Sequence, residues 1–415
     1  MNTRLILLAL LLIAGFSIVV FADKPENTPE EKKSAKEATS EAVTDTMKLA
    51  QDNNAFAFDL YARLSQQEGN IFFSPYSIST ALAMIYAGAR GNTEKQIAQT
   101  LHFTLPQEKL HLAVQSISED LIDSKYYQLH IANALWGQKG EKFLDAFLEL
   151  NKKYYGAGLN EVDFMKATEE ARQTINVWVE KQTRDKIKEL ISKGILNALT
   201  LLILTNAIYF KGSWELEFDS KKTTDTAFTL MDNKSISVPM MYRKGYYRYV
   251  EERGFQMLEL PYKGKRLSML ILLPDKVEGL AELGRSLNTD YFNKLLNGLT
   301  KREVRVNLPR FKIIREFELT KTLIGMGMLD AFSRKADFSG IYGKKDIFFS
   351  NVIHKAFVDV NEEGTEAAAS TGIVMSKNGG GPLFRADHPF LFLIQDMQSG
   401  SILFLGRMMN PRVDE

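Results

Sequence analysis

The sequence predicts an α+β protein with one large core and extensive β-sheet. Three observations lead to this prediction: a globular composition, a helical periodicity early in the chain, and short strand-like segments later in it. The chain has 415 residues, of which 45% are hydrophobic and 25% charged, and this profile is typical of globular proteins with ample core. Helices in the first half and strands in the second favour an α+β arrangement built around large sheets.

The clearest helical segment is residues 169–191, "EEARQTINVWVEKQTRDKIKELI". It places Ala171, Ile175 and Val179 on one face and charged residues opposite, which is the pattern of an amphipathic helix. Five later segments are short, rich in β-branched or aromatic residues, and bounded by Pro, Gly or Asp, so we expect strands there. They are "RLSMLILLP" (266–274), "EVRVNLPRF" (303–311), "KAFVDVN" (355–361), "HPFLFLIQD" (388–396) and "SILFLGRM" (401–408).

The first 45 residues read differently from the rest. Arg4 precedes an apolar run over residues 5–22, and small residues precede Asp23, so residues 1–22 are expected to be a signal peptide cleaved after Ala22. The run is long enough that an uncleaved membrane anchor stays open. Residues 23–45 lack aromatics and are rich in Glu, Lys, Ser and Thr, which predicts a flexible tether. Residues 46–415 then form a single domain.

These features predict a secreted, extracellular protein, with a periplasmic or membrane-anchored location as the alternative. The chain contains no Cys, so its core alone must stabilise it outside the cell. The formal net charge of +1 argues against a nucleic-acid partner. We expect a monomer.

Sequence motifs of enzymes and cofactor sites are absent. The chain lacks G-x-S-x-G, H-E-x-x-H, a Walker loop and C-x-x-C, and "GMGMLD" (325–330) is better explained as a helix terminus than as a dinucleotide turn. No two of the five histidines have helical ligand spacing, so neither a metal nor a cofactor is expected. A Ser-His-Asp site assembled from distant residues stays open, because geometry and not sequence defines such sites.

The most unusual segment is "NEEGTEAAASTGIVMSKNGGGP", residues 361–382. Gly364 can act as a hinge, and with a period of two the residues after it form two faces of small side chains without a proline. Such a segment could enter a sheet as an extra strand. Taken alone, a short Ala-rich helix or a plain loop explains it as well.

Several motifs occur together in one order. They are "NIFFSPYSISTALAMIYAGARGNTEKQIAQTL" (70–101), "LTNAIYFKGSWELEF" (204–218), "MLELPYKGKRLSMLILLP" (257–274), "VIHKAFVDVNEEGTEAAA" (352–369) and "HPFLFLI" (388–394). On these motifs the chain resembles the serpins, over essentially everything after Thr46. The resemblance implies the serpin fold, with a large mixed sheet that expands by loop insertion, further sheets, and about eight to nine helices. It also implies that residues 362–388 are the reactive-centre loop.

The resemblance implies a protease inhibitor that acts as a suicide substrate and not an enzyme. The protease cuts the loop, and the hinge side inserts into the sheet while the protease remains as an acyl-enzyme. The hinge residues that match are Glu362, Glu363, Gly364, Thr365, Glu366, Ala367, Ala368, Ala369 and Ser370. The expected partner is a serine protease, trypsin-like or subtilisin-like, or else a cysteine protease. The alternative is a non-inhibitory serpin, chaperone-like or storage-like, that is cut without trapping. The missing Cys and the export signal suggest a microbial member.

The position of the cut bond follows from the match to the hinge glutamate. Sixteen residues after Glu362 lies Asn378-Gly379, and a loop one residue shorter would instead give Lys377-Asn378. Met375-Ser376 is a third option. The glycines that follow Asn378 are expected to keep this region mobile and accessible.

Six further residues match family positions below and beside the loop. Ser74, Ser77, Asn206 and His354 match the polar shutter cluster under the sheet, and a hydrogen-bonded core network would explain them equally. Trp214 and Arg310 match the breach, where the loop first enters. For Trp214 plain packing is the alternative, whereas for Arg310 we predict an ion pair with Glu362 that holds the loop out, worth ~0–1 kcal/mol at a surface.

Overall fold

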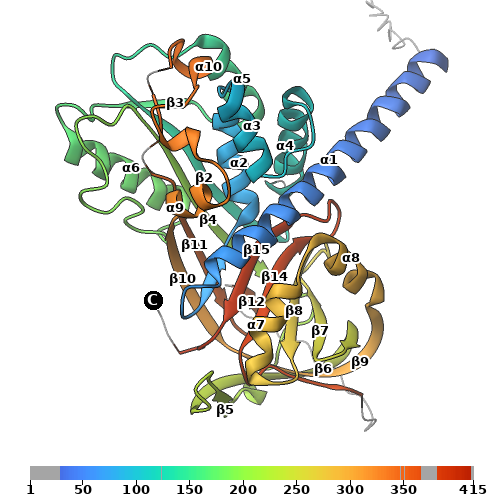
Figure 1. Cartoon of the computed structure of the whole chain (residues 1–415). Coiled ribbons are helices and arrows are strands. Elements are labelled where there is room, and N and C mark those ends of the chain that lie inside the picture. Colours follow the sequence, from blue (N-terminus) through green and yellow to red (C-terminus); the bar gives the residue numbers. More distant parts are fainter. Residues whose placement is uncertain (1–28, 123, 346, 350, 366–380, 413–415) are drawn as a thin grey trace, which may run out of the picture. The chain divides into compact units, whose positions relative to one another are not determined.

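The computed structural model describes residues 29–122, 124–345, 347–349, 351–365 and 381–412. The chain divides into two units, Met1–Ala42 and Val43–Glu415. The first contains the start of helix α1, and the second contains the remaining helices and all strands of the described residues (Figure 1). Among the helices described, none combines the length and hydropathy that crossing a bilayer requires. The apolar run 5–22 lies outside the described residues.

The α-helices are α1 (Pro29–Leu64), α2 (Pro75–Tyr86), α3 (Gly91–Thr100), α4 (Gln107–Ile122), α5 (Asp145–Tyr155), α6 (Thr168–Gln182), α7 (Leu280–Ser286), α8 (Thr289–Gly298), α9 (Thr320–Gly325) and α10 (Ser339–Tyr342). The short 3-10 helices are η1 (Ser220–Lys222), η2 (Val277–Gly279) and η3 (Asp330–Phe332). The strands are β1 (Ile71–Phe73), β2 (Tyr127–Gln138), β3 (Leu159–Val162), β4 (Leu202–Ser213), β5 (Thr224–Thr229), β6 (Ser235–Glu252), β7 (Phe255–Pro261), β8 (Leu267–Pro274), β9 (Thr300–Pro309), β10 (Phe311–Glu318), β11 (Ile353–Val360), β12 (Gly364–Thr365), β13 (Leu383–Arg385), β14 (Phe390–Asp396) and β15 (Ile402–Met408).

Helix α1 begins inside the segment that we expected to be a tether. Its backbone is helical from Pro29, a local structure that the expected flexible tether over residues 23–45 did not include. The sequence "PEEKKSAKEATSEAVTD" is rich in Ala, Glu and Lys, which have high intrinsic helix propensity even where no core is available. Our sequence prediction considered burial and left this propensity out.

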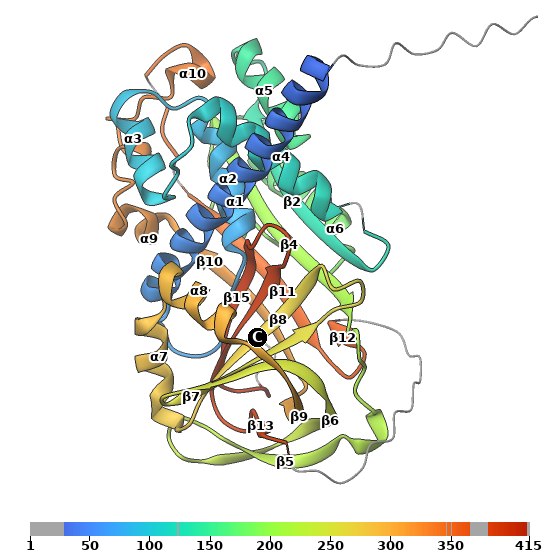
Figure 2. The ribbon, with the colours of Figure 1, turned by 90° about the vertical axis from the view of Figure 1, so that its right-hand side faces the viewer.

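The six-stranded sheet has the order β10-β11-β12-β4-β2-β3, and β11 also pairs directly with β4 (Figure 2). Both of its faces are covered. On one face Trp136, Tyr209 and Phe357 pack with Ile175 and Val179 of α6 in one hydrophobic cluster. On the other face the sheet lies against α2, whose twelve residues are all buried. A residue that enters this sheet must therefore fit between two packed layers.

The nine-stranded sheet has the order β1-β15-β14-β8-β7-β6-β9-β13, with β5 paired to β6. Strands β14, β15 and β8 are buried throughout, and together they form the centre of the larger core. The long strand β6 pairs with β9 over residues 240–249 and with β7 through its last five residues, 248–252. The nine-stranded sheet therefore ends in an edge at which β13 pairs with β9.

The predicted elements are largely confirmed. All five strand-like segments form strands, and "GMGMLD" begins at Gly325, the last residue of α9. The helix expected over residues 169–191 ends at Gln182, because Arg184 and Asp185 adopt positive φ angles of 54° and 61°. Ten α-helices are present in the part of the chain described, and α9 and α10 have only six and four residues.

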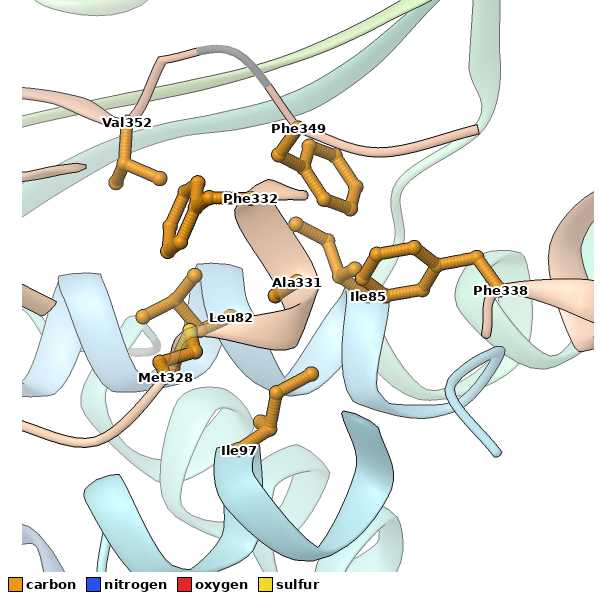
Figure 3. Close-up of a pocket in the computed structure, with 9 residues that line it drawn as sticks. All are labelled: Leu82, Ile85, Ile97, Met328, Ala331, Phe332, Phe338, Phe349 and Val352. Carbon is orange, nitrogen blue, oxygen red and sulfur yellow. The ribbon is translucent and has the colours of Figure 1, made fainter. Parts of the chain in front are cut away.

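A small apolar cavity lies beside α2 (Figure 3). The centre of a water-sized sphere can occupy about 10 Å³ inside it, which is close to the minimum for holding one water molecule. Leu82 and Ile85 of α2 contribute to its wall, and Ala331 of η3 faces them in the close-up. The other lining residues are Ile97, Met328, Phe332, Phe338, Phe349 and Val352. The cavity is a local packing defect next to the helix that supports the six-stranded sheet.

Candidate functional site

A row of polar side chains crosses the middle of the six-stranded sheet. His354 of β11 lies opposite Asn206 of β4, and Asn206 lies opposite Asn133 of β2. The Ser74 backbone N–H donates to His354 Nε2 at 3.0 Å, so Nδ1 carries the ring proton and donates to Asn206 Oδ1. Complete burial lowers the pKa of His354 to about 3, because the charged imidazolium would lose its hydration. His354 is therefore neutral at ordinary pH.

The same row is joined to the start of α2. Asn206 Nδ2 donates to Ser77 Oγ at 2.7 Å and to Asn133 Oδ1 at 2.6 Å. The Ser77 backbone N–H donates to Ser74 Oγ, which caps α2 and donates in turn to the carbonyl of Leu403 at 2.6 Å. The structure thus brings the four predicted shutter residues, Ser74, Ser77, Asn206 and His354, into one hydrogen-bonded network.

Asn133 belongs to this network and was not predicted. Its side chain accepts from Asn206 and Ser77. The signal was present in "LHIANALWG", where an Asn lies between two alanines of a largely apolar strand. A partly buried amide of this kind needs hydrogen-bond partners, so it marks a polar network.

Strands β11 and β4 separate toward their C-terminal ends, beyond the polar row, and the first hinge residues lie between them. The two strands pair directly in parallel from Ile353 and Thr205 to Phe357 and Tyr209. Beyond that point β12 takes the place between them, with Thr365 opposite both Val360 and Gly212. Two residues of the hinge are therefore already strand members of the six-stranded sheet.

Gly364 is required at the start of β12. Its φ is +152°, and a Cβ there would lie 2.1 Å from the carbonyl oxygen of Gly212. No side chain fits that approach, so the hinge position predicted from sequence also has a steric reason to be glycine.

Thr365 is fully buried and its hydroxyl shares a hydrogen bond of 2.8 Å with Tyr262. The ring of Tyr262 stacks on Trp214 at 4.6 Å between centroids. Trp214 reaches the turn before the hinge, because its Nε1 donates to the carbonyl of Asn361 and its backbone N–H donates to the carbonyl of Glu363. The predicted breach residue Trp214 thus contacts the hinge turn, and Tyr262 is a contact that our sequence prediction missed.

The expected ion pair between Arg310 and Glu362 is present. Arg310 Nε lies 2.7 and 2.6 Å from the two carboxylate oxygens, and Thr223 also donates to this carboxylate. Burial alone would raise the pKa of Glu362, but the hydrogen bonds from Arg310 and Thr223 outweigh it and leave the pKa lowered. The Arg310 side chain is 44% exposed and the Glu362 side chain only 7%, so solvent screens the pair from the arginine side alone.

The middle of the predicted loop, residues 366–380, lies outside the described residues. This applies to Glu366, Ala367, Ala368, Ala369, Ser370, Lys377, Asn378 and Gly379.

The far end of the loop is described from Gly381 onward. A Cβ on Gly381 would lie 1.9 Å from the carbonyl oxygen of Glu303, and Arg305 Nε donates to the carbonyl of Gly381 at 3.3 Å. We had expected this glycine to be mobile, but in the structure it lies against β9, where it attaches the end of the loop to the sheet.

Comparison with known proteins supplies the family. The model of the family described as "Serpin (serine protease inhibitor)" matches residues 51–411. The human leukocyte elastase inhibitor is 45% identical over 381 residues, which cover 88% of this chain and 99% of that protein. Human thyroxine-binding globulin complexed with its ligand superposes with a TM-score of 0.82 at 34% identity, covering 88% of this chain and 99% of that one. A loop-inserted, cleaved mutant of ovalbumin superposes with a TM-score of 0.81 at 32% identity, covering 88% and 100%.

These matches correct one expectation and show the serpin family and fold. Proteins named leukocyte elastase inhibitor from mammals and Xenopus match at 43–45% identity, so the suggestion of a microbial member has no support. The match begins at residue 51 and leaves the apolar N-terminus unaccounted for. The chain therefore belongs to the serpin family of serine protease inhibitors and is not an enzyme.

Proposed function

We propose that this serpin inhibits its target protease as a suicide substrate whose cleaved loop enters the six-stranded sheet. The observation that carries this proposal is the position of β12, whose two residues already pair between β11 and β4. A cut further along the loop would free the following residues to continue the same strand. The protease, still attached as an acyl-enzyme, would then be carried with them.

The register of β12 gives the proposal a specific geometry. Thr365 lies opposite Val360 and Gly212, so six residues further along the loop Thr371 would reach His354 and Asn206. That is the polar row, where a Thr hydroxyl can find hydrogen-bond partners. The positions between them on the same face are Ala367 and Ala369, small enough to enter between two packed layers. Both points support insertion in this register.

The polar row has a function in this proposal. Asn206 and His354 face each other directly across the β11–β4 pair, and the incoming strand would separate them. Ser74 and Ser77 on α2 keep contact with both residues from below. A network with partners on two sides can exchange one hydrogen bond for another, which lowers the cost of opening the sheet there.

The target class is proposed by homology. The relatives are named for inhibition of leukocyte elastase, so a serine protease such as elastase is the first candidate. An elastase S1 pocket lacks the carboxylate that binds Lys in trypsin, so the apolar Met375 suits it better than the charged Lys377 or the polar Asn378. The two arguments, homology and loop alignment, therefore favour different bonds: Met375-Ser376 for elastase, Lys377-Asn378 for a trypsin-like protease, and Asn378-Gly379 for an asparagine-directed one.

The experiment is incubation with elastase, trypsin, subtilisin, papain and an asparaginyl protease, each in turn. At least one serine protease should give a complex that survives boiling in SDS, and mass spectrometry of the released peptide should identify the bond. Cleavage by every protease without any such complex would contradict the proposal and indicate a non-inhibitory serpin.

We also propose that the chain is exported. The support is Arg4, the apolar residues 5–22 and the small residues before Asp23. Expression with the native N-terminus followed by N-terminal sequencing should find mature protein starting at Asp23. An intact N-terminus in the membrane fraction would indicate an anchor, and an intact N-terminus in the cytosol would contradict export.

A further inference from the structure

The outward face of β6, β9 and β13 is rich in basic side chains. Val304 and Val306 of β9 are buried, so the alternate residues Lys301 and Arg305 point to the other face of the strand. The pairing of β6 and β13 with β9 aligns further side chains with these two. We call this the basic face, defined by Lys244, Tyr246, Arg248, Lys301, Arg305, Leu383 and Arg385.

Part of this charge is compensated and part is not. Lys244 pairs with Glu303 at 3.1 Å, Arg248 with Glu259 at 2.7 Å, and Arg385 with Asp387 at 2.9 Å. Among the residues that the structure describes, no carboxylate lies within ion-pair distance of Lys301 or Arg305. The face therefore has a net positive charge, and acidic groups are interspersed within it.

The basic face also exposes apolar and aromatic surface. The Tyr246 side chain is 63% exposed, and Lys301 Nζ lies 5.9 Å from the centre of its ring. Leu383 of β13 is 42% exposed. Exposed Tyr and Arg beside an apolar residue are typical of protein interfaces, whereas a site for a linear polyanion needs little more than charge.

The basic face lies next to the far end of the loop, which indicates that the protease bound to the loop is its partner. Arg305 donates from Nε to the carbonyl of Gly381 and from its backbone N–H to the carbonyl of Pro382. The three proposed bonds lie no more than six residues before Gly381, so their distance from it is at most ~22 Å at ~3.6 Å per residue. A protease domain of about 250 residues has a radius of gyration of ~18 Å. A protease bound at any of these bonds is thus brought next to the basic face.

We propose that the basic face is a second docking surface for the target protease and that it favours proteases with acidic surface beside the active-site cleft. The inference rests on the proposed inhibitory function. A rim of uncompensated charge increases the rate of encounter more than it changes the final complex. The basic face therefore selects the target by association rate, while the cut bond is selected by the loop.

The test compares Lys301→Glu with Lys335→Glu. Lys335 is exposed and lies in the chain between η3 and α10. Helix α10 lies at the opposite end of the Val43–Glu415 unit from β9 (Figure 1), and the Lys335 substitution changes net charge by the same amount. The probe is pancreatic elastase, native and after succinylation, which converts surface ammonium groups to carboxylates. The measurements are the association rate at 50 and 500 mM salt, the stoichiometry of inhibition, and the unfolding temperature of each variant.

We expect succinylated elastase to associate faster than native elastase with the wild type. Lys301→Glu should slow its association roughly three- to tenfold at 50 mM salt and less than about twofold at 500 mM. Stoichiometry and unfolding temperature should not change, and Lys335→Glu should behave as wild type.

Equal rates for all variants, with normal complexes, would overturn this inference and leave the proposed function standing. Loss of heparin binding in Lys301→Glu with unchanged protease association would also overturn it, in favour of a polyanion site. If no protease forms a boiling-resistant complex, the proposed function itself fails.

Discussion

The substitution Thr365→Arg tests the connection between hinge and sheet at its most constrained point. Thr365 is fully buried, pairs with two strands, and shares a hydrogen bond with Tyr262. Arg at this position loses that bond, worth ~1 kcal/mol, and leaves the Tyr262 hydroxyl unpaired at a cost of ~1–3 kcal/mol. It also brings a guanidinium among apolar rings, which costs several kcal/mol even after local relaxation.

Together these costs come to about 5 kcal/mol or more, which lowers the population of the docked hinge by more than a factor of about 1000. We therefore expect Thr365→Arg to be cut at the same bond as the wild type but to release active protease. The assay is titration of a fixed amount of protease with each variant. The stoichiometry of inhibition should rise at least tenfold, and the boiling-resistant complex should disappear from gels.

Thr365→Val is the matched control. It removes the hydroxyl and leaves the Tyr262 hydroxyl unpaired, as Arg does, but it brings no charge and no bulk into the sheet. Trapping should therefore fall less than in Thr365→Arg, and the complex should remain. The reasoning is refuted if Thr365→Arg forms complex with wild-type stoichiometry, because the docked hinge would then have no part in trapping.

Three further predictions concern the ion pair of the hinge, the cavity beside α2 and the buried His354. Arg310→Gln should lower the free energy of unfolding by no more than ~1 kcal/mol, because Arg310 is solvent-exposed and Thr223 still donates to the Glu362 carboxylate. A loss above ~3 kcal/mol in urea denaturation would contradict this. Ala331→Val should fill the cavity and raise the free energy of unfolding by ~1 kcal/mol. Ala83→Val, in the tightly packed α2, should lower it instead. Equal changes in unfolding temperature for the two variants would contradict the presence of free space at Ala331. The pKa of His354 is lowered to about 3 in the folded chain. Below about pH 6.5, His354 is therefore protonated in the unfolded chain but still neutral in the folded chain. Stability should therefore fall as pH drops from about 6.5 towards 3, and His354→Asn should show a shallower slope in unfolding temperature against pH.

The contacts expected around the hinge came from the serpin resemblance and not from the residues alone. The resemblance implied that the residues matched to the shutter share one polar cluster, and they are hydrogen-bonded in the structure. It also implied an ion pair between Arg310 and Glu362, and the structure contains that pair. The strands followed directly from their composition, because β-branched and aromatic runs have few alternatives in a large core.

Contacts that depend on three-dimensional proximity could not be predicted in this way. Tyr262 and Thr365 are far apart in the chain, and nothing in "LPYKGK" indicates that its Tyr will meet the hinge. Gly381 was assigned to mobility because glycine permits it, but the nearby carbonyl of Glu303 gives this glycine a steric function. The start of α1 was missed for a different reason, since burial was considered and helix propensity was not.

The measurement that tests the account most directly is the unfolding temperature of the protein before and after its loop is cut. A protease that cuts between residues 375 and 379 is used, and the product is separated from protease before calorimetry. If the freed segment continues β12 along β11 and β4, the cut protein gains strand pairing and should unfold at a clearly higher temperature than the intact protein. An unfolding temperature equal to or below that of the intact protein would contradict insertion and the inhibitory function built on it.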